Sequence, residues 1–478
     1  MGAGLFAAAL LFKESALALV GIFPFLELGR RKPAEGVRGR ALRWGLPVVA
    51  VLIGYLALRT AVLGGIGRSA GEISPLDNII AHPEYGLDPD GSRTLARWGT
   101  PLAVFGQSCR LLVWPWPLSW DYSYAAIENV HHWSEPRLWA GAAILAGCLA
   151  GMVVSWRRRR VVFAAVGLAL VSYFIVSNTL MLIGAVFAER YLYLPSAGFC
   201  MLVGCAVAAV ARRGTKSESA SVAGRRRRFA CLVAAMLGLV IVAGGAATMA
   251  RNRDFVSNAV LDAADVRTQP RSARLWTATA VDALNGGDRR LALERASQAL
   301  AICPLDMRAW RVSARAHWEL KENAAALECA NKVFEAVGFT DAALVVVAGD
   351  IYQAQGDYAR AIAILESFAS GSGGREGPTR GEPVLDLGPQ TATAYNNLAW
   401  YLLVAQPPEL RDPQRALRYA ERAVAIKPAA GDFLDTYVSV LQALGRVEDA
   451  RRVLDAALPM IPASDQFRDG LLRKRQEL

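Results

Sequence analysis

The chain has 478 residues and a formal net charge of +11, and 54% of its residues are hydrophobic. Long apolar runs alternate with short arginine clusters up to about residue 250, and an Ala-rich helical pattern follows. Because the basic residues lie beside apolar segments, they indicate cytoplasmic anchoring of a membrane protein and argue against a nucleic-acid partner. Seven cysteines without a CxxC pair indicate neither a disulfide framework nor a zinc site.

Several apolar runs are long enough for membrane helices, each of which needs about 20 mostly apolar residues. A shorter run at 15–28 is expected to join residues 3–12 as one long or broken helix. The predicted spans are 44–63, 137–156, 161–183, 191–211 and 229–249. The sequence thus predicts a polytopic membrane domain over residues 1–250.

Basic clusters predict the orientation of these spans, because Lys and Arg are enriched in cytoplasmic loops. Segment 64–136 is then entirely exoplasmic, with 99–118 lying in the interface or re-entering the membrane. The last span runs outward, so the C-terminal half is expected on the periplasmic or luminal side. The three clusters lie at 29–43, 157–160 and 211–228.

The stretch WPWPLSWDYSYAAIENV, residues 114–130, lies in this outer segment. No helix can continue through Pro115 and Pro117, since each lacks a backbone donor. The surrounding tryptophans suit the lipid headgroup level, where amphipathic aromatic rings are favoured. These tryptophans are Trp98, Trp114, Trp116, Trp120 and Trp133.

Acidic and aromatic side chains of the same stretch form a candidate sugar-binding set. Asp121 and Glu128 supply hydrogen-bond acceptors, and Tyr122 and Tyr124 supply rings that can stack on a sugar. The same residues suit an ordinary interfacial loop equally well. Both interpretations stay open from the residues alone.

Two charge pairs at membrane edges are further candidates. Lys13-Glu14 interrupts an apolar stretch, which marks either a functional site or a pair that reaches from a helix end to the interface. Glu189-Arg190 lies beside Tyr191, and its arginine could hold a lipid phosphate through two parallel hydrogen bonds. The alternative for Glu189-Arg190 is an interface anchor with a local ion pair. No spacing of His, Asp or Glu indicates a metal site.

After Arg251 the sequence repeats with a period of about 34 residues, the length of a tetratricopeptide helix–turn–helix unit. Small residues recur where helices pack closely, and a proline ends the second helix in most units. Repeats 1–3 are expected over 251–370, a Gly/Pro-rich flexible insertion over 371–390, and repeats 4–5 over 391–478. Such an α-solenoid commonly binds an extended peptide in its concave groove. A passive spacer is the alternative, and Trp276 and Trp310 are expected to be packing residues.

Three motifs together resemble one known family. WPWPLSWDYSYAAI resembles the outer segment of the transmembrane-and-tetratricopeptide-repeat O-mannosyltransferases, LLFKESALAL their lysine–glutamate element, and ERYLYLPSAGF their late membrane motif. The order of membrane helices, outer segment and repeats also matches. The resemblance implies an all-α chain, with a membrane helical bundle of the C-type glycosyltransferase fold followed by a solenoid of repeats.

The resemblance also implies an activity, the transfer of a sugar, typically mannose, from a polyprenyl phosphate to Ser or Thr of exoplasmic proteins. No cofactor is implied, since the lipid-linked sugar is itself the donor substrate. Lys13 and Arg190 would lie near the donor phosphate, and Asp121, Tyr122, Tyr124, Glu189 and Tyr191 would shape the cavity. The repeats would hold the acceptor protein.

One part of the family pattern is expected to be missing. The key acidic residue of this class lies in the first outer loop, before the lysine–glutamate element, which here begins at residue 13. The chain is therefore expected to be an N-terminally truncated enzyme or a non-catalytic remnant, with Glu14 and Asp121 as the local acids that could act instead. A membrane-anchored repeat scaffold for envelope proteins is the main alternative, and a lipid-linked sugar polymerase or ligase is a third.

Overall fold

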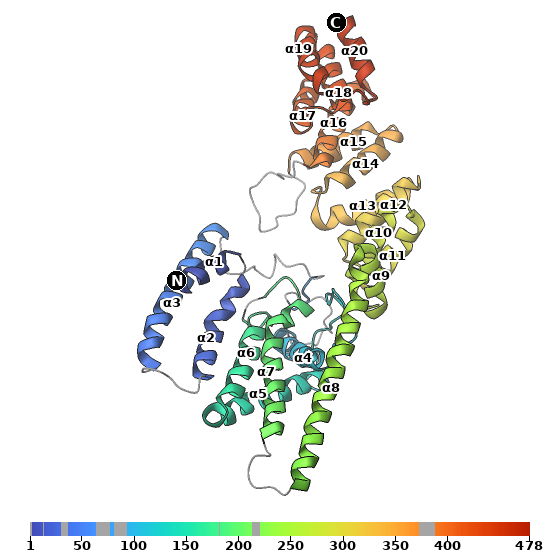
Figure 1. Cartoon of the computed structure of the whole chain (residues 1–478). Coiled ribbons are helices and arrows are strands. Elements are labelled where there is room, and N and C mark those ends of the chain that lie inside the picture. Colours follow the sequence, from blue (N-terminus) through green and yellow to red (C-terminus); the bar gives the residue numbers. More distant parts are fainter. Residues whose placement is uncertain are drawn as a thin grey trace. The chain divides into compact units, whose positions relative to one another are not determined.

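The computed structural model describes residues 2–12, 14–29, 37–63, 77–80, 93–180, 182–212, 220–371 and 388–478. In these residues all regular elements are helices, apart from one bridge between Tyr124 and Ile127. The chain divides into two compact units, Met1–Ala278 and Thr279–Leu478 (Figure 1). The all-α prediction is confirmed.

The first unit contains the apolar helices. Those before residue 160 are α1 Gly2–Phe12, α2 Ala18–Gly29, α3 Val37–Leu63, α4 Arg93–Val113 and α5 Pro136–Arg158. They are followed by α6 Arg160–Phe174, α7 Tyr193–Arg212, α8 Ala220–Asn252 and α9 Asn258–Thr268. A 3-10 turn, Glu14–Leu17, separates α1 from α2, so the first apolar stretch forms a broken helix.

Within the described residues, four helices are long and apolar enough to cross a membrane. They contain Gly45–Val62, Pro136–Arg158, Glu189–Ala209 and Cys231–Asn252, and they match four of the five predicted spans. Helix α4 spans Arg93–Val113 and ends before Trp114, as Pro115 and Pro117 require.

The prediction of a span over 161–183 is wrong in its extent, because α6 ends at Phe174. Beyond it the backbone turns, and Asn178 adopts a left-handed conformation with φ 60°. Its side-chain oxygen accepts hydrogen bonds from the amide of Asn78, at 2.7 Å, and from the backbone N–H of Ile183, at 2.9 Å. These polar contacts satisfy a non-helical backbone that the apolar sequence does not reveal.

Glycines allow the apolar helices to approach closely. A Cβ atom on Gly141 of α5 would lie 2.0 Å from the carbonyl oxygen of Leu102 in α4. A Cβ atom on Gly198 of α7 would lie 2.5 Å from the carbonyl oxygen of Ala165 in α6. Figure 1 shows α4 to α7 side by side. Close backbone approach through small residues is typical of helix packing in membranes.

The repeat region consists of paired helices. The pairs are α10 Ala273–Asn285 with α11 Arg289–Ile302, α12 Met307–Glu319 with α13 Asn323–Val337, α14 Ala342–Ala354 with α15 Tyr358–Ala369, α16 Pro389–Val404 with α17 Pro413–Ile426, and α18 Gly431–Ala443 with α19 Val447–Ala457. Helix α20, Arg468–Glu477, follows the last pair. The predicted tetratricopeptide-like repeats are confirmed, while residues 372–387 of the expected insertion lie outside the described residues.

Sequence spacing explains the regularity of these pairs. In four of them the residue that ends the inter-helix turn has positive φ: Gly287, Lys321, Gly356 and Gly445. Alanines at the helix contacts are fully buried, among them Ala280, Ala292, Ala314 and Ala326. The indole N–H groups of Trp276 and Trp310 each donate to a carbonyl six residues earlier, of Pro270 and Pro304, which is a local structural contact.

Candidate functional site

The stretch after α4 folds back on itself and buries its polar centre. Ser119, Asp121, Tyr122 and Ser123 are all buried, whereas the tryptophans at 114 and 116 are exposed. A turn closed by a hydrogen bond from the N–H of Ala126 to the carbonyl of Ser123 follows. The aromatic half of the stretch is therefore open to its surroundings, and the acidic half is not.

The carboxylate of Asp121 accepts hydrogen bonds from hydroxyls of its own chain. Its Oδ2 atom lies 2.6 Å from the Oγ atoms of both Ser123 and Ser272, and its side chain is 5% exposed. Its Oδ1 atom lies 3.8 Å from Nε of Arg274, which also pairs with Asp77 at 2.7 Å. Ser272 immediately precedes α10 and accepts from the N–H of Leu275. Asp121 thus fixes the first turn of α10.

Tyr122 and Glu189 form a second buried contact. The Tyr122 hydroxyl donates to Glu189 Oε1 at 2.6 Å, and the same oxygen accepts from the N–H of Ser119 at 2.7 Å. The ring of Tyr122 packs edge-on against Phe187, with 5.0 Å between centroids. Burial, and then the hydrogen bond to Glu189, raise the pKa of Tyr122 well above its ordinary value, so its hydroxyl stays a proton donor.

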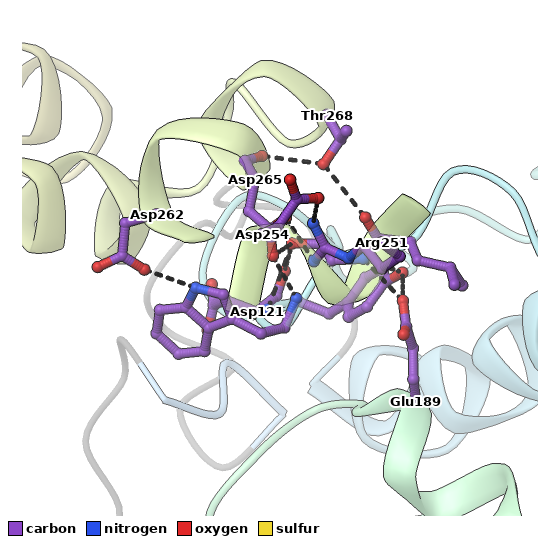
Figure 2. A network of polar contacts seen from close by, with 11 residues as sticks. Asp121, Glu189, Arg251, Asp254, Asp262, Asp265 and Thr268 are labelled. Atoms are coloured by element: carbon purple, nitrogen blue, oxygen red, sulfur yellow. Dashed lines mark hydrogen bonds and ion pairs between the residues drawn. The ribbon is translucent and has the colours of Figure 1, made fainter. Parts of the chain in front are cut away.

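Two carboxylates of α9 complete the network, and the sequence analysis missed both. Asp265 is fully buried, accepts from the N–H of Trp120 at 2.7 Å and pairs with Arg251 at 2.6 Å. Asp262 accepts from the indole N–H of Trp120, also at 2.7 Å (Figure 2). Asp262 and Asp265 are three residues apart, so they lie on one face of the helix that follows the last apolar run. This spacing could have predicted a shared polar contact.

This network changes the interpretation of Trp120. Its sequence context predicts an interfacial tryptophan, but its indole N–H binds Asp262 and its ring lies 5.4 Å from the guanidinium of Arg274. The other four predicted interfacial tryptophans are more than half exposed, as headgroup contacts require.

Arg190 differs from its neighbours in the network. It is exposed, and it makes no hydrogen bond or ion pair with any residue that the structure describes. Its guanidinium lies 5.3 Å from the ring centroid of the half-buried Tyr191. The adjacent carboxylate of Glu189 is directed to Tyr122 and Ser119, so Arg190 remains an available cation at the start of the α7 span.

The structure brings together Asp121, Tyr122 and Glu189 in one region, while Tyr124 is half-buried nearby and packs against the same apolar cluster as Tyr122. Lys13 and the side chain of Glu14 lie outside the described residues. Among the residues that the structure does describe, no group of three or more His, Cys, Asp or Glu side chains could hold a metal ion.

Comparison with known proteins gives a distant and partial match. No family model matches the chain. Protein O-mannosyl-transferase TMTC4 of Mus musculus and that of Homo sapiens are each 32% identical to it over 114 residues, which is 23% of this chain. The chain covers only 15% of the length of each relative.

Several solved structures are similar to part of the chain. The Pseudomonas aeruginosa protein PilF has a TM-score of 0.34 and 16% identity, over 43% of this chain and 83% of that protein. YrrB, described as a TPR protein with an unusual peptide-binding site, has a TM-score of 0.34 and 13% identity, over 45% of this chain and 98% of that protein. The chain is all-α, with four long apolar helices, a tetratricopeptide-like repeat region and a partial, distant similarity to an O-mannosyltransferase.

Proposed function

We propose that this protein is a membrane glycosyltransferase that moves a sugar, typically mannose, from a polyprenyl phosphate to Ser or Thr of exoplasmic proteins. The similarity to TMTC4, the four apolar helices and the repeat region support this class of function. A tetratricopeptide-like fold implies protein or peptide binding. We assign binding of the acceptor protein to the repeats.

The observation that carries the proposal is the exposed guanidinium of Arg190, which has no hydrogen bond or ion pair with the described residues. A cation at the end of an apolar helix, with its neighbouring carboxylate bound elsewhere, offers a fork of donors to a lipid phosphate. Positive charge at that point also stabilises the charge that develops on a departing phosphate. Lys13 is a second proposed phosphate contact, by resemblance only. Because the carboxylate of Asp121 accepts hydrogen bonds from the hydroxyls of Ser123 and Ser272, we assign it the role of positioning the start of α10.

The first test compares Arg190→Ala, Arg190→Lys and the unchanged full chain in lipid nanodiscs. The probe is a short-chain polyprenyl phosphate, with the matching alcohol as the control for the lipid tail. Loss of a charge-assisted contact costs about 1.5–3 kcal/mol, so Arg190→Ala should bind the phosphate roughly 10- to 100-fold more weakly. Arg190→Lys, which keeps the charge but loses the fork, should fall between the two.

Arg253 provides a matched control, because it is also exposed, follows a candidate span and has no ion pair among the described residues. Arg253→Ala should leave phosphate binding unchanged. Equal binding by Arg190→Ala and the unchanged chain would remove the phosphate role of Arg190.

A second candidate function is a membrane-anchored scaffold that recruits envelope proteins through the repeats. The burial of Asp121 and Tyr122, whose polar atoms are used within the chain, favours this alternative. A scaffold should retain its protein partners in the Arg190→Ala variant and show no sugar transfer in any variant. Transfer to an acceptor by the unchanged chain, lost with Arg190→Ala, would exclude a scaffold without chemistry.

A further inference from the structure

A small pocket lies beside the network, within the first unit. Its volume is about 210 Å³, and its walls come from four separate segments. Gln107 comes from α4, residues 125–128 from the outer stretch, Arg137 from α5, and residues 269–271 from the turn between α9 and α10. Ala125, in its wall, has a left-handed backbone with φ 62°, a conformation that non-glycine residues adopt at a cost.

The charges in the wall are matched to one another. Arg137 donates to the carbonyl oxygens of Glu128, at 2.9 Å, and Asn129, at 2.6 Å, and pairs with Glu135. Arg271 pairs with the carboxylate of Glu128, and both of these side chains are partly exposed. A phosphate or an ammonium group would therefore meet no uncompensated charge here, so the pocket favours a neutral ligand.

Two glutamine side chains in the wall have no hydrogen-bond partner in the part of the chain that the structure describes. Neither Gln107 nor Gln269 makes a side-chain hydrogen bond with any residue that the structure describes, and both are half-buried. Each amide offers two N–H donors and one carbonyl acceptor, and this combination suits hydroxyl groups, which both donate and accept. A sugar whose hydroxyl groups replace the water at these amides keeps their hydrogen bonds satisfied.

We propose that this pocket binds a single neutral monosaccharide unit, held by the amides of Gln107 and Gln269. Its volume of about 210 Å³ is small, and it suits one sugar ring better than a long lipid-linked donor or a peptide segment. Pro270 and Ile127 give the wall an apolar part for the C–H face of a sugar ring. The choice of mannose as the first sugar to test rests on the proposed function. The expectation of a neutral sugar rests on the residues that line the pocket.

The test uses saturation-transfer NMR on the full chain in nanodiscs. The probes are methyl α-mannoside, methyl α-glucoside, a peptide with one O-mannosyl threonine, and the same peptide without sugar. At least one methyl hexoside and the glycopeptide should receive saturation, and the plain peptide should not. Binding of the glycopeptide at least tenfold tighter than of the hexosides would identify a glycosylated protein as the source of the sugar, and comparable binding would identify a free sugar.

The double variant Gln107→Leu/Gln269→Leu should bind these sugars at least roughly tenfold more weakly, because two or more neutral hydrogen bonds are lost. Gln298→Leu, at an exposed glutamine of α11, is the matched control and should bind normally. Unchanged thermal unfolding of the double variant establishes that the pocket walls still fold. If it does not fold, Gln107→Glu and Gln269→Glu replace it, since they keep the size of the side chain and should weaken binding of the neutral sugars.

Arg190→Ala separates this inference from the donor-phosphate proposal. It should reduce phosphate binding and leave the hexoside signal intact. Three results would each overturn the sugar site. They are no saturation with the unchanged chain, the same signal in the glutamine variants as in the unchanged chain, and binding of the plain peptide as tight as that of the glycopeptide. None of these results would alter the expectation for Arg190.

Discussion

Glu189 and Arg190 are adjacent, yet the structure gives their side chains opposite surroundings. Ala188 is extended, with φ −153°, and a short 3-10 turn begins at Glu189. The Glu189 carboxylate is held inward by Tyr122 and Ser119, and Arg190 is left exposed. The sequence motif alone suggested a local ion pair as one alternative, but the carboxylate is bound by a residue 67 positions away. The available cation is thus a consequence of a tertiary contact.

In the repeats, Asp350 of α14 accepts from Asn397 at 2.9 Å and from the hydroxyl of Tyr401 at 2.7 Å. Burial raises the pKa of Asp350 above its ordinary value, although these two hydrogen bonds oppose the shift. The folded state therefore holds the Asp350 proton more tightly than the unfolded chain does. The resulting stabilisation is present below the unfolded pKa, near 3.9, and is lost as pH rises through the higher folded pKa.

This sign predicts that Asp350→Asn stabilises the repeats at pH 7, because asparagine keeps an acceptor oxygen without the buried charge. The gain should be about 1.4 kcal/mol for each unit by which the pKa of Asp350 is raised, and it should shrink as pH falls toward 4. Denaturant unfolding of the full chain, followed by fluorescence at several pH values, measures the difference. Glu409→Gln, at an exposed carboxylate without a partner among the described residues, should show no such trend. A gain for Asp350→Asn that is constant with pH would contradict the titration.

At the scale of elements, residues 118–128 and helix α9 are held together by side chains from both. The backbone and the indole of Trp120 reach Asp265 and Asp262, and Thr268 donates to the carbonyl of Leu118 at 3.5 Å. Asp121 adds the contact to Ser272, before α10. The outer stretch therefore supports the first helices that follow the α8 span.

Trp120→Phe tests this support, because it removes the indole N–H that binds Asp262 and leaves the backbone contact to Asp265 in place. The lost hydrogen bond to a charged group should cost about 1.5–3 kcal/mol. Amide hydrogen exchange in the α9 segment of the full chain should accelerate roughly tenfold or more. Trp133→Phe alters an exposed tryptophan of the same outer region and should leave α9 exchange unchanged. Equal exchange in the two variants would show that α9 is held by other contacts.

Particular elements show what the sequence could predict. The repeat pairs were predictable because alanine and proline recur at local, fixed spacings, and the end of α4 followed from Pro115 and Pro117. The end of α6 could not be predicted, because it depends on the side-chain hydrogen bond between Asn178 and Asn78, which are 100 residues apart. The sequence also predicted Asp121, Tyr122 and Glu189 as candidate residues. It did not predict the contacts that hold the two carboxylates, which come from Ser272 and Ser119. Because Glu189 is held in this way, it does not pair with the neighbouring Arg190.

At the scale of the whole molecule, the proposed function depends on the side of the membrane on which the repeats lie. The arginine clusters predict that the last span runs outward and that the repeats are exoplasmic. This orientation would place the repeats on the same side of the membrane as segment 64–136. The proposed transferase and the alternative scaffold for envelope proteins both require that arrangement.

Cys303 and Cys329 can test the orientation, since both are buried in the repeats and neither is in a disulfide. The other five cysteines are first replaced, and sealed right-side-out vesicles are treated with a membrane-impermeant maleimide. Little labelling is expected while the repeats are folded, because burial protects both thiols and raises the pKa of Cys329 to about 11. In urea that unfolds the repeats without opening the vesicles, both thiols should react from outside. The control is Ser217→Cys, between the last two predicted spans, which should react only after the membrane is opened. If Ser217→Cys reacts from outside and the repeat thiols react only after opening, the orientation is reversed. The proposed function would then lose its exoplasmic acceptor.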